Sequence, residues 1–317
     1  MSTDWQSCAS NEVLLLRGQL LEQIRRFMTQ RNILEVDTPV LSRTSIPDTN
    51  IENVICDISI QGKEQAFYLH TSPEVHMKRL LAGGSGAIYQ ITKVFRDNEL
   101  GPCHQPEFSM LEWYRPEFDH HKLMDEMSEL LSELGLATAE RKSYESVFVE
   151  HLQLNPHTAS IGQLQTLTKD LGLHEKTNER SILLEFLFSH SISPKLGREV
   201  PLMLYDYPLC QAALAKLSDT EPQTALRFEL FIEGMEIANG FYELRDAKQQ
   251  AQRFSDENDR RGKENKALIK IDENFLQALE AGLPDCAGVA IGIDRLLMIL
   301  SGKSHIKDVM TFPVKNA

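Results

Sequence analysis

The stretch 91–115 constrains the fold of this chain most strongly. Two apolar runs flank a polar loop with a glycine and two prolines, which is typical of a long antiparallel hairpin. Side chains alternate along a strand, so the second run gathers an aromatic ring, a carboxylate and a phenol on one face: Phe108, Glu112 and Tyr114. Arg96 ends the first run and His104 lies in the loop. These groups suit an anion beside a flat ring, with arginine binding a phosphate. A strand face held by salt bridges explains this stretch equally well.

Composition excludes several classes of protein. Hydrophobic residues make up 42% of the 317 residues and charged residues 25%, as in ordinary globular enzymes. No window approaches the run of about 20 apolar residues that a membrane span needs, and the N-terminus does not resemble a signal peptide. Five cysteines without CxxC spacing predict free thiols and a cytoplasmic protein. The net charge of −13 makes tRNA an unfavourable partner and favours a small cationic substrate or a basic protein surface.

A second polar cluster surrounds a hairpin turn predicted at 233–234. Glu229 precedes the turn and Glu236 follows it, so the two arms bring both carboxylates onto one face, about 5 Å apart if directly opposed. Two close carboxylates are tolerated when a divalent cation lies between them, and oxygen ligands suit Mg²⁺. Asn239-Gly240 predicts a further turn, and Glu243 beyond it suits an ammonium group. A polar hairpin with solvated glutamates is the alternative, and we favour the metal site.

A third cluster lies near the C-terminus. Gly288, Ala290 and Gly292 share one face of a predicted strand, where small residues leave room for a flat ligand. Arg295 follows at the start of an apolar helix, where the backbone already favours an anion. A glycine-rich buried strand is the alternative, but it leaves Arg295 unexplained. Upstream, Ser72 is predicted to cap a helix that begins at Pro73.

Helical periodicity predicts the remaining elements. The predicted helices cover residues 10–32, 118–136, 161–189, 246–266 and 272–281. We interpret 144–198 as a helical insertion and 246–266 as a helix with a solvated charged face.

These segments resemble the signature motifs of the class II aminoacyl-tRNA synthetases. The hairpin resembles motif 2, the helix and strand that end at Pro39 resemble motif 1, and 287–300 resembles motif 3. The TSPE and NGFYEL segments match as well. The resemblance implies an α+β fold, with the antiparallel sheet of a class II catalytic core flanked by helices. It implies one catalytic domain over 1–317, no anticodon-binding domain, and a homodimer formed through motif 1.

The resemblance is closest to the lysine-type enzymes and, within them, to stand-alone paralogues that attach (R)-β-lysine to elongation factor P. Motif 1 begins almost at the N-terminus, and Ala290 stands where lysyl-tRNA synthetases usually have glycine. The resemblance implies an ATP- and Mg²⁺-dependent ligase that forms an aminoacyl-adenylate and transfers it to a protein lysine. A truncated lysine-activating synthetase that acts on tRNA and a non-catalytic regulator that binds ATP or an amino acid remain alternatives.

The resemblance also implies a role for individual residues. The catalytic residues are Arg96 and Arg295. The ATP-binding residues are Arg96, Glu99, His104, Phe108, Glu229, Gly292 and Arg295. The substrate-binding residues are Ser72, Glu74, Glu112, Tyr114, Glu236, Asn239, Glu243 and Ala290. The Mg²⁺ ligands are Glu229 and Glu236.

Three positions of motif 2 depart from the family pattern. Asn98 stands where many relatives have glutamate, and Glu99 takes that role one position later. Pro102-Cys103 occupies the place of a usual arginine, and Gln105 that of a usual asparagine. These differences predict altered contacts between the loop and ATP.

Overall fold

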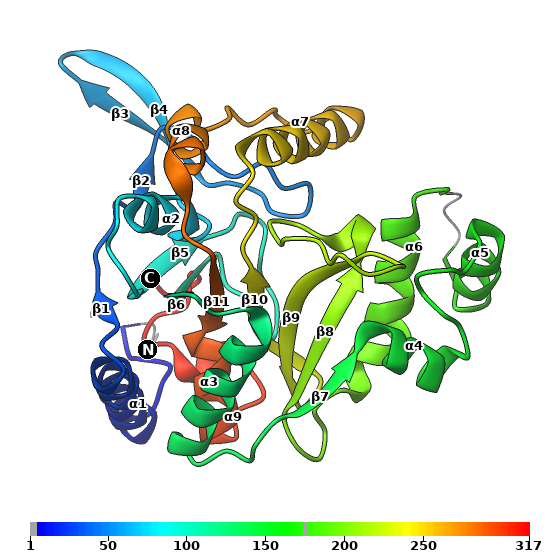
Figure 1. The fold of residues 1–317 in the computed structure, drawn as a ribbon. Coiled ribbons are helices and arrows are strands. Elements are labelled where there is room, and N and C mark those ends of the chain that lie inside the picture. Colours follow the sequence, from blue (N-terminus) through cyan, green and yellow to red (C-terminus); the bar gives the residue numbers. More distant parts are fainter. Residues whose placement is uncertain (1–4, 174–176) are drawn as a thin grey trace. The chain divides into compact units, whose positions relative to one another are not determined.

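The computed structural model describes residues 5–173 and 177–317, and the chain forms two compact units (Figure 1). Unit 1 comprises Met1–Glu117, Arg245–Cys286 and Ala290–Ala317, and unit 2 comprises Phe118–Leu244 and Ala287–Val289. Among the described residues, no helix is both long enough and apolar enough to cross a membrane. All five cysteines are free thiols, as predicted.

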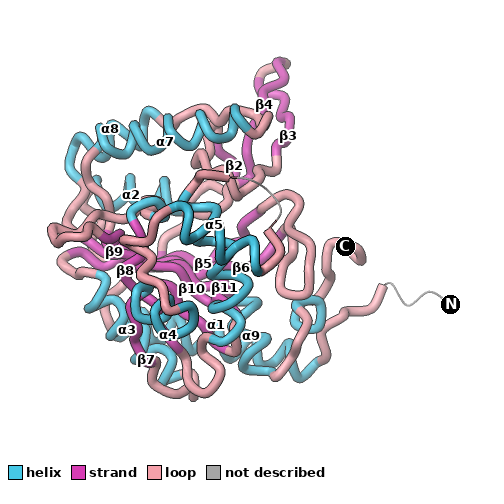
Figure 2. The backbone as a smooth tube through the Cα atoms, turned by 90° about the vertical axis from the view of Figure 1, so that its right-hand side faces the viewer, coloured by secondary structure: helices cyan, strands magenta, loops and turns pink. Residues whose placement is uncertain are grey.

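Unit 1 combines helices with parts of two sheets. Its helices are α1 (Asn11–Gln30), α2 (Glu74–Ala82), α7 (Ala247–Lys263), α8 (Glu273–Gly282), α9 (Ile293–Ser301) and the 3₁₀ turn η4 (Ile306–Val309). Its strands in the large mixed sheet are β1 (Leu34–Glu35), β5 (Ile88–Phe95) and β6 (Glu107–Pro116), hydrogen-bonded in that order. A small sheet has the order β2 (Leu41–Ser42), β4 (Lys63–Leu69), β3 (Ile55–Ile60). Figure 2 shows α7 and α8 next to each other.

The helix predicted for motif 1 is confirmed as α1. The Ser10 side chain accepts a hydrogen bond from the Val13 N–H, which satisfies one of the unpaired donors at the start of the helix. One stripe of α1 is buried, including Leu20, Ile24 and Phe27. The cap predicted for α2 was wrong, because the helix begins at Glu74 after Pro73 and no side chain caps it.

The predicted hairpin 91–115 is confirmed as β5 and β6. Its register pairs Val94 with Phe108 and Gln90 with Glu112, so the predicted polar and aromatic face is intact. Trp113 points to the other face and is fully buried. The hairpin is therefore packed on both sides, and the residues of motif 2 stand on a rigid support.

Unit 2 contains the other strands and helices. In chain order they are α3 (His120–Glu133), β7 (Glu140–Ser143), α4 (Tyr144–Leu152), α5 (Ile161–Asp170), α6 (Arg180–Leu187), the π-helical turn η1 (Phe188–Ile192), the 3₁₀ turn η2 (Ser193–Lys195), β8 (Leu202–Pro208), the 3₁₀ turn η3 (Leu209–Gln211), β9 (Thr224–Ile232) and β10 (Met235–Tyr242). The strand order is β10–β9–β8–β7. The pair β7–β8 is parallel, and the other two pairs are antiparallel. The last strand, β11 (Cys286–Gly292), has residues in both units.

Helices of the predicted insertion form part of the core of unit 2. The stretch 161–189 contains two helices rather than one, and its residues 174–176 lie outside the described residues. Tyr144 of α4 and Leu187 of α6 belong to one buried cluster with Leu204 of β8 and Phe231 of β9. The helices therefore cover one face of these two strands.

A buried carboxylate joins the three signature segments within unit 1. Asp294, in the first turn of α9, is 1% exposed. One oxygen accepts a hydrogen bond from the Ser109 N–H of β6 at 2.6 Å, and the other pairs with Arg17 of α1. A buried charge is costly unless it is paired, so Asp294 fixes motif 3 against motifs 1 and 2.

We expect Asp294→Ala to lower the free energy of unfolding by about 3 kcal/mol, because it leaves Arg17 and the Ser109 N–H without their partner. Urea denaturation measures this loss. Asp294→Asn is the matched control, since it keeps an acceptor for Ser109 and removes only the charge, and it should cost clearly less. Equal losses for the two variants would contradict the role of the backbone hydrogen bond.

Candidate active site

Arg96 and Phe108 lie together at the loop end of the hairpin in unit 1. The Arg96 guanidinium carbon lies 5.2 Å from the centre of the Phe108 ring. Glu99 lies 3.8 Å from Arg96, in the position predicted to replace the usual glutamate. The structure thus brings together three of the residues predicted to bind ATP. A cation beside an aromatic ring can hold a phosphate next to a stacked base.

His104 and Arg295 form the second contact of this group. Arg295 Nη2 lies 2.7 Å from His104 Nε2, and Arg295 Nε donates to the Cys103 carbonyl oxygen at 3.2 Å. A guanidinium only donates, so His104 Nε2 is the acceptor and the imidazole proton lies on Nδ1. A Cβ atom added at Gly292 would lie 3.8 Å from the Arg295 side chain, so the two residues are close neighbours. The motif 2 loop and the start of α9 therefore form one cluster.

The unusual residues of the loop make contacts with the C-terminal segment. The Pro102 carbonyl oxygen accepts a hydrogen bond from the Ile306 N–H at 2.7 Å. Gln105 is 4% exposed, and its side-chain oxygen accepts from the Val314 N–H at 3.2 Å. Gln105 thus anchors the loop to the protein's own backbone.

Three predicted substrate residues of unit 1, Glu74, Glu112 and Tyr114, are buried and already hydrogen-bonded. The Tyr114 hydroxyl donates to Glu112 at 2.6 Å, which confirms that these two side chains share a face. Glu74 accepts from Lys78 Nζ at 2.6 Å, and Lys78 is 1% exposed. Residues four apart are neighbours on a helix, so this spacing was a signal for the pair, but our sequence reasoning missed Lys78.

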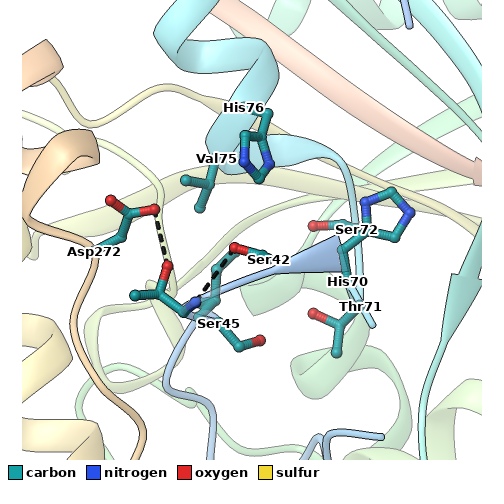
Figure 3. Close-up of a pocket in the computed structure, with 10 residues that line it drawn as sticks. Ser42, Ser45, His70, Thr71, Ser72, Val75, His76 and Asp272 are labelled. Atoms are coloured by element: carbon teal, nitrogen blue, oxygen red, sulfur yellow. Dashed lines mark hydrogen bonds between the residues drawn. The ribbon is translucent and has the colours of Figure 1, made fainter. Parts of the chain in front are cut away.

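Ser72 borders a small polar pocket in unit 1 (Figure 3). Thr44, Ser45, His70, Thr71, His76 and Asp272 also line it. Thr44 donates to the Asp272 carboxylate at 3.0 Å, so two of the lining side chains already bond each other. The cavity volume of about 20 Å³ has room for roughly one water molecule. It is too small for an amino acid. Ala290 lies in β11 and is partly buried.

In unit 2 the structure places the two predicted metal ligands on one face of the sheet. Glu229 pairs with Asn239, and Glu236 pairs with Phe231. The two glutamates are therefore diagonal neighbours rather than directly opposed. A bulge between Glu236 and Ala238 brings Asn239 onto the same face.

The turn predicted at Asn239-Gly240 was wrong. Both residues lie inside β10, and a side chain at Gly240 would meet the Phe228 ring at 2.5 Å. Glycine is needed here because an aromatic ring approaches the backbone. Glu243 follows β10 and is 1% exposed.

The Glu229 carboxylate is surrounded by charged and polar side chains. One oxygen pairs with Arg227, and the other accepts from the Tyr207 hydroxyl at 2.6 Å. Burial raises the pKa of the Glu229 carboxyl to about 7. Arg227 and Tyr207 oppose this shift, whereas the charges of Glu236 and Glu185 add to it.

This donor set fits a magnesium ion. Negative charge exceeds positive charge here, because Arg227 faces three carboxyl groups: Glu229 itself, Glu236 and Glu185. Among residues 5–173 and 177–317, no three His, Cys, Asp or Glu side chains converge as metal ligands. Mg²⁺ is commonly bound by one or two carboxylates, with water and substrate phosphates as its other ligands. Two glutamates are therefore enough.

The α+β fold, with a large mixed sheet flanked by helices, is that of a class II synthetase domain. The chain matches the family of tRNA synthetases class II (D, K and N) over residues 2–316, and it belongs to that family. It is 45% identical to a protein of Vibrio atlanticus named elongation factor P–(R)-β-lysine ligase, over 99% of both chains. Proteins with the same name from Haemophilus influenzae and Vibrio cholerae are 46% and 45% identical, each over at least 98% of both chains.

Sequence reasoning missed Arg227 and Tyr207 beside Glu229. Arg227 stands two residues before Glu229 in a strand, so the two share a face, and the spacing was available as a signal. Tyr207 gave no such signal, since it belongs to a different strand. Arg261, assigned to a solvated helix face, is instead 1% exposed and bonds the Asp48 carbonyl oxygen at 2.6 Å.

The raised pKa of Glu229 predicts a pH-dependent stability without divalent metal. The folded protein keeps this proton up to about pH 7, whereas the unfolded chain loses it near the ordinary value of 4.5. Within this window the folded state binds more protons, so its stability falls as the pH rises, by up to about 1.4 kcal/mol per pH unit. We expect the stability of Glu229→Gln relative to wild type to increase from pH 5 to pH 7. Chemical denaturation in EDTA measures the difference in unfolding free energy between the two proteins. A difference that stays constant from pH 5 to pH 7 would contradict the raised pKa of Glu229.

Proposed function

We propose that this protein is an ATP-dependent ligase that activates (R)-β-lysine as an adenylate and transfers it to a lysine of elongation factor P. The observation that carries the proposal is about 45% identity, over nearly the whole chain, to proteins named for this reaction. The alternatives, a truncated enzyme acting on tRNA and a regulator without turnover, have no comparable support.

The cluster in unit 1 supports ATP binding. Phe108 and Arg295 enclose the adenine in this proposal, Arg96 binds the α-phosphate, and His104 binds the outer phosphates, with Glu99 and Gly292 beside them. The observed contacts Arg96–Phe108 and Arg295–His104 already group these side chains. Preorganised cations stabilise the charge that develops during phosphoryl transfer, and Arg96 at the α-phosphate is catalytic for this reason. Arg295 is catalytic in this proposal because the guanidinium that borders the adenine also contacts His104 and so brings positive charge beside the outer phosphates.

Glu229 and Glu236 hold Mg²⁺ in this proposal. The ion supplies charge neutralisation for the polyphosphate when it is bound. Arg227 and Tyr207 orient Glu229 through the two hydrogen bonds to its carboxylate. Burial of Glu229 strengthens the preference of this face for a cation.

The substrate is a small dication with one carboxylate. Glu112, Glu243 and Glu74 are buried acidic groups, which suit its ammonium groups, and Ser72, Tyr114, Asn239 and Glu236 complete the predicted set. The substrate carboxylate attacks the α-phosphorus of ATP, and pyrophosphate leaves. The amine of the protein lysine then attacks the carbonyl carbon of the adenylate, loses its proton, and releases AMP. The methyl group of Ala290 narrows the pocket and favours the β-amino acid.

The net charge and the exposed surface of motif 1 support the proposed partners. An acidic protein of net charge −13 attracts a basic segment that bears the target lysine. Leu15, Leu34 and Leu41 lie in or next to motif 1 and are 69%, 58% and 41% exposed. Exposed apolar residues of this kind favour a homodimer. We place the reaction in the cytoplasm, where ATP and the translation factor occur.

Amino-acid-dependent ATP–pyrophosphate exchange tests the first step, without tRNA and without a protein partner. We expect exchange with (R)-β-lysine to exceed exchange with α-lysine. Ala290→Gly should shift the preference toward α-lysine, because it removes the methyl group from the pocket. Arg295→Ala should reduce exchange roughly a hundredfold or more, as does the loss of one preorganised donor in other enzymes.

Transfer is tested by incubating the protein with ATP, (R)-β-lysine and purified elongation factor P. A mass increase of one β-lysyl group on that factor supports the ligase. Charging of tRNA at a higher rate would favour the truncated synthetase, and ATP binding without exchange would favour the regulator.

We expect light scattering to give the mass of a dimer, and Leu34→Asp to give a monomer, because the charge disrupts an apolar contact between copies. Leu268→Asp is the matched control, since Leu268 is similarly exposed, at 64% against 58% for Leu34, but lies outside motif 1. A monomeric wild type, or a dimer that both variants leave intact, would rule out this interface.

A further inference from the structure

We infer that Arg227 is a positioning residue that sets the orientation of both Glu229 and Asn239. The inference rests on the proposed function, which assigns Glu229 to the metal and Asn239 to the substrate. It adds that a single guanidinium in unit 2 couples these two groups, with Tyr207 as a second support for Glu229.

Arg227 makes three hydrogen bonds with one planar group. Its Nη2 donates to Glu229 Oε1 and, at 3.1 Å, to Asn239 Oδ1. Its Nη1 donates to the Gln211 carbonyl oxygen at 2.9 Å. The side chain is only 9% exposed. The guanidinium is therefore held at three points, and it holds Glu229 and Asn239 in turn.

Two aromatic rings fix the plane of the guanidinium. Its central carbon lies 4.3 Å from the centre of the Tyr207 ring and 5.4 Å from that of Phe241. Phe241 is the direct cross-strand partner of Arg227, just as Asn239 is that of Glu229. Contacts between a guanidinium and aromatic rings are favourable, and they leave the edge of the fork free to donate.

A bulge in β8 is needed to bring Tyr207 onto this face. Leu204 pairs with Glu229, so regular alternation would point Tyr207 to the opposite side of the sheet. The register shifts between Tyr205 and Tyr207, and Asp206 adopts a left-handed backbone with φ of 59°. Tyr207 then pairs with Ala225 and shares the face of Arg227 and Glu229. A residue in this strained conformation persists where surrounding contacts require it, and the Tyr207–Glu229 hydrogen bond is such a contact.

The bond from Arg227 determines what Asn239 presents to a ligand. Because a guanidinium only donates, the side-chain atom of Asn239 that faces it must be the oxygen. The amide nitrogen is therefore the atom left for the substrate, and it is a donor. Asn239 accordingly recognises an acceptor, such as the substrate carboxylate, and not an ammonium group.

A lysine at position 227 cannot reproduce this arrangement. Its ammonium is a single point, whereas the guanidinium reaches three acceptors in one plane. Arg227→Lys should keep the positive charge beside Glu229, but it should no longer hold the Glu229 and Asn239 side chains in one fixed orientation. Tyr207→Phe keeps the ring under Arg227 and removes only the hydroxyl that supports Glu229. Arg227→Lys therefore tests the orientation of Glu229 and Asn239 at constant charge. Tyr207→Phe tests the support of Glu229 while the packing of the ring on Arg227 is kept.

Binding of Mn²⁺, the spectroscopic substitute for Mg²⁺, is measured by electron paramagnetic resonance with a non-hydrolysable ATP analogue present. We expect Arg227→Lys and Tyr207→Phe each to weaken Mn²⁺ roughly ten- to a hundredfold, as loss of the groups that orient metal ligands does elsewhere. Arg227→Lys should also raise the KM for β-lysine in pyrophosphate exchange, and Tyr207→Phe should not. Asn239→Asp should also raise that KM, because it replaces the amide donor that faces the substrate with an acceptor.

Arg180→Lys is the matched control in the same unit. Arg180 makes two side-chain hydrogen bonds, to the carbonyl oxygens of Ala159 and Pro156, and neither partner belongs to the candidate site. Arg180→Lys should change neither the Mn²⁺ affinity nor the KM for β-lysine. The melting temperature of each variant shows whether that variant is folded.

The outcomes separate the two proposals. Wild type that binds Mn²⁺ but shows no exchange would refute the proposed function, while a loss of Mn²⁺ affinity in the variants would still support the positioning role. Wild type that exchanges, with folded Arg227→Lys and Tyr207→Phe indistinguishable from it, would overturn the positioning role alone. Wild type that binds no Mn²⁺ would overturn both the metal site and the role of Arg227.

Discussion

Burial of paired charge is the constraint on which both units depend. In unit 1 the carboxylate of Asp294 is 1% exposed and joins α1, β6 and α9. In unit 2 Arg227 is 9% exposed, and its guanidinium joins Glu229 to Asn239. A buried charge without its partner is strongly destabilising, so each of these groups fixes the elements around it. Several of the residues predicted to meet ATP, metal and substrate stand on those elements, among them Phe108, Arg295 and Glu236.

Irregularities in the strands create the chemistry of unit 2. Regular alternation would divide the polar residues of β8 and β10 between the two faces of the sheet. One bulge turns Tyr207 toward Glu229, and another brings Glu236 and Asn239 onto the same face. Five polar side chains thereby share a surface that a regular sheet could not provide. Strand bulges near functional sites commonly have this effect.

The helical segment 144–198 contributes to this surface. Tyr144 and Leu187 pack on the face of β8 and β9 that also bears Glu229. Glu185 of α6 adds its negative charge to the field that raises the pKa of Glu229. Similarly, Gln105 and Pro102, which depart from the family pattern, connect the motif 2 loop to the C-terminal segment of unit 1. Residues outside the signature motifs, together with unusual residues of motif 2, thus help to shape the candidate site.

The sequence alone determined the elements and most of the candidate site residues. Local periodicity and turn residues predicted α1, the β5–β6 hairpin and the turn at Glu233-Gly234, because these signals act over a few neighbouring residues. Tertiary structure decided the rest. The register of β9 and β10, the need for glycine at Gly240, and the pairing of Arg227 with Tyr207 and Glu229 depend on contacts between separate strands. Such contacts leave no local pattern, since each strand alone is compatible with several registers and the packing of side chains selects one.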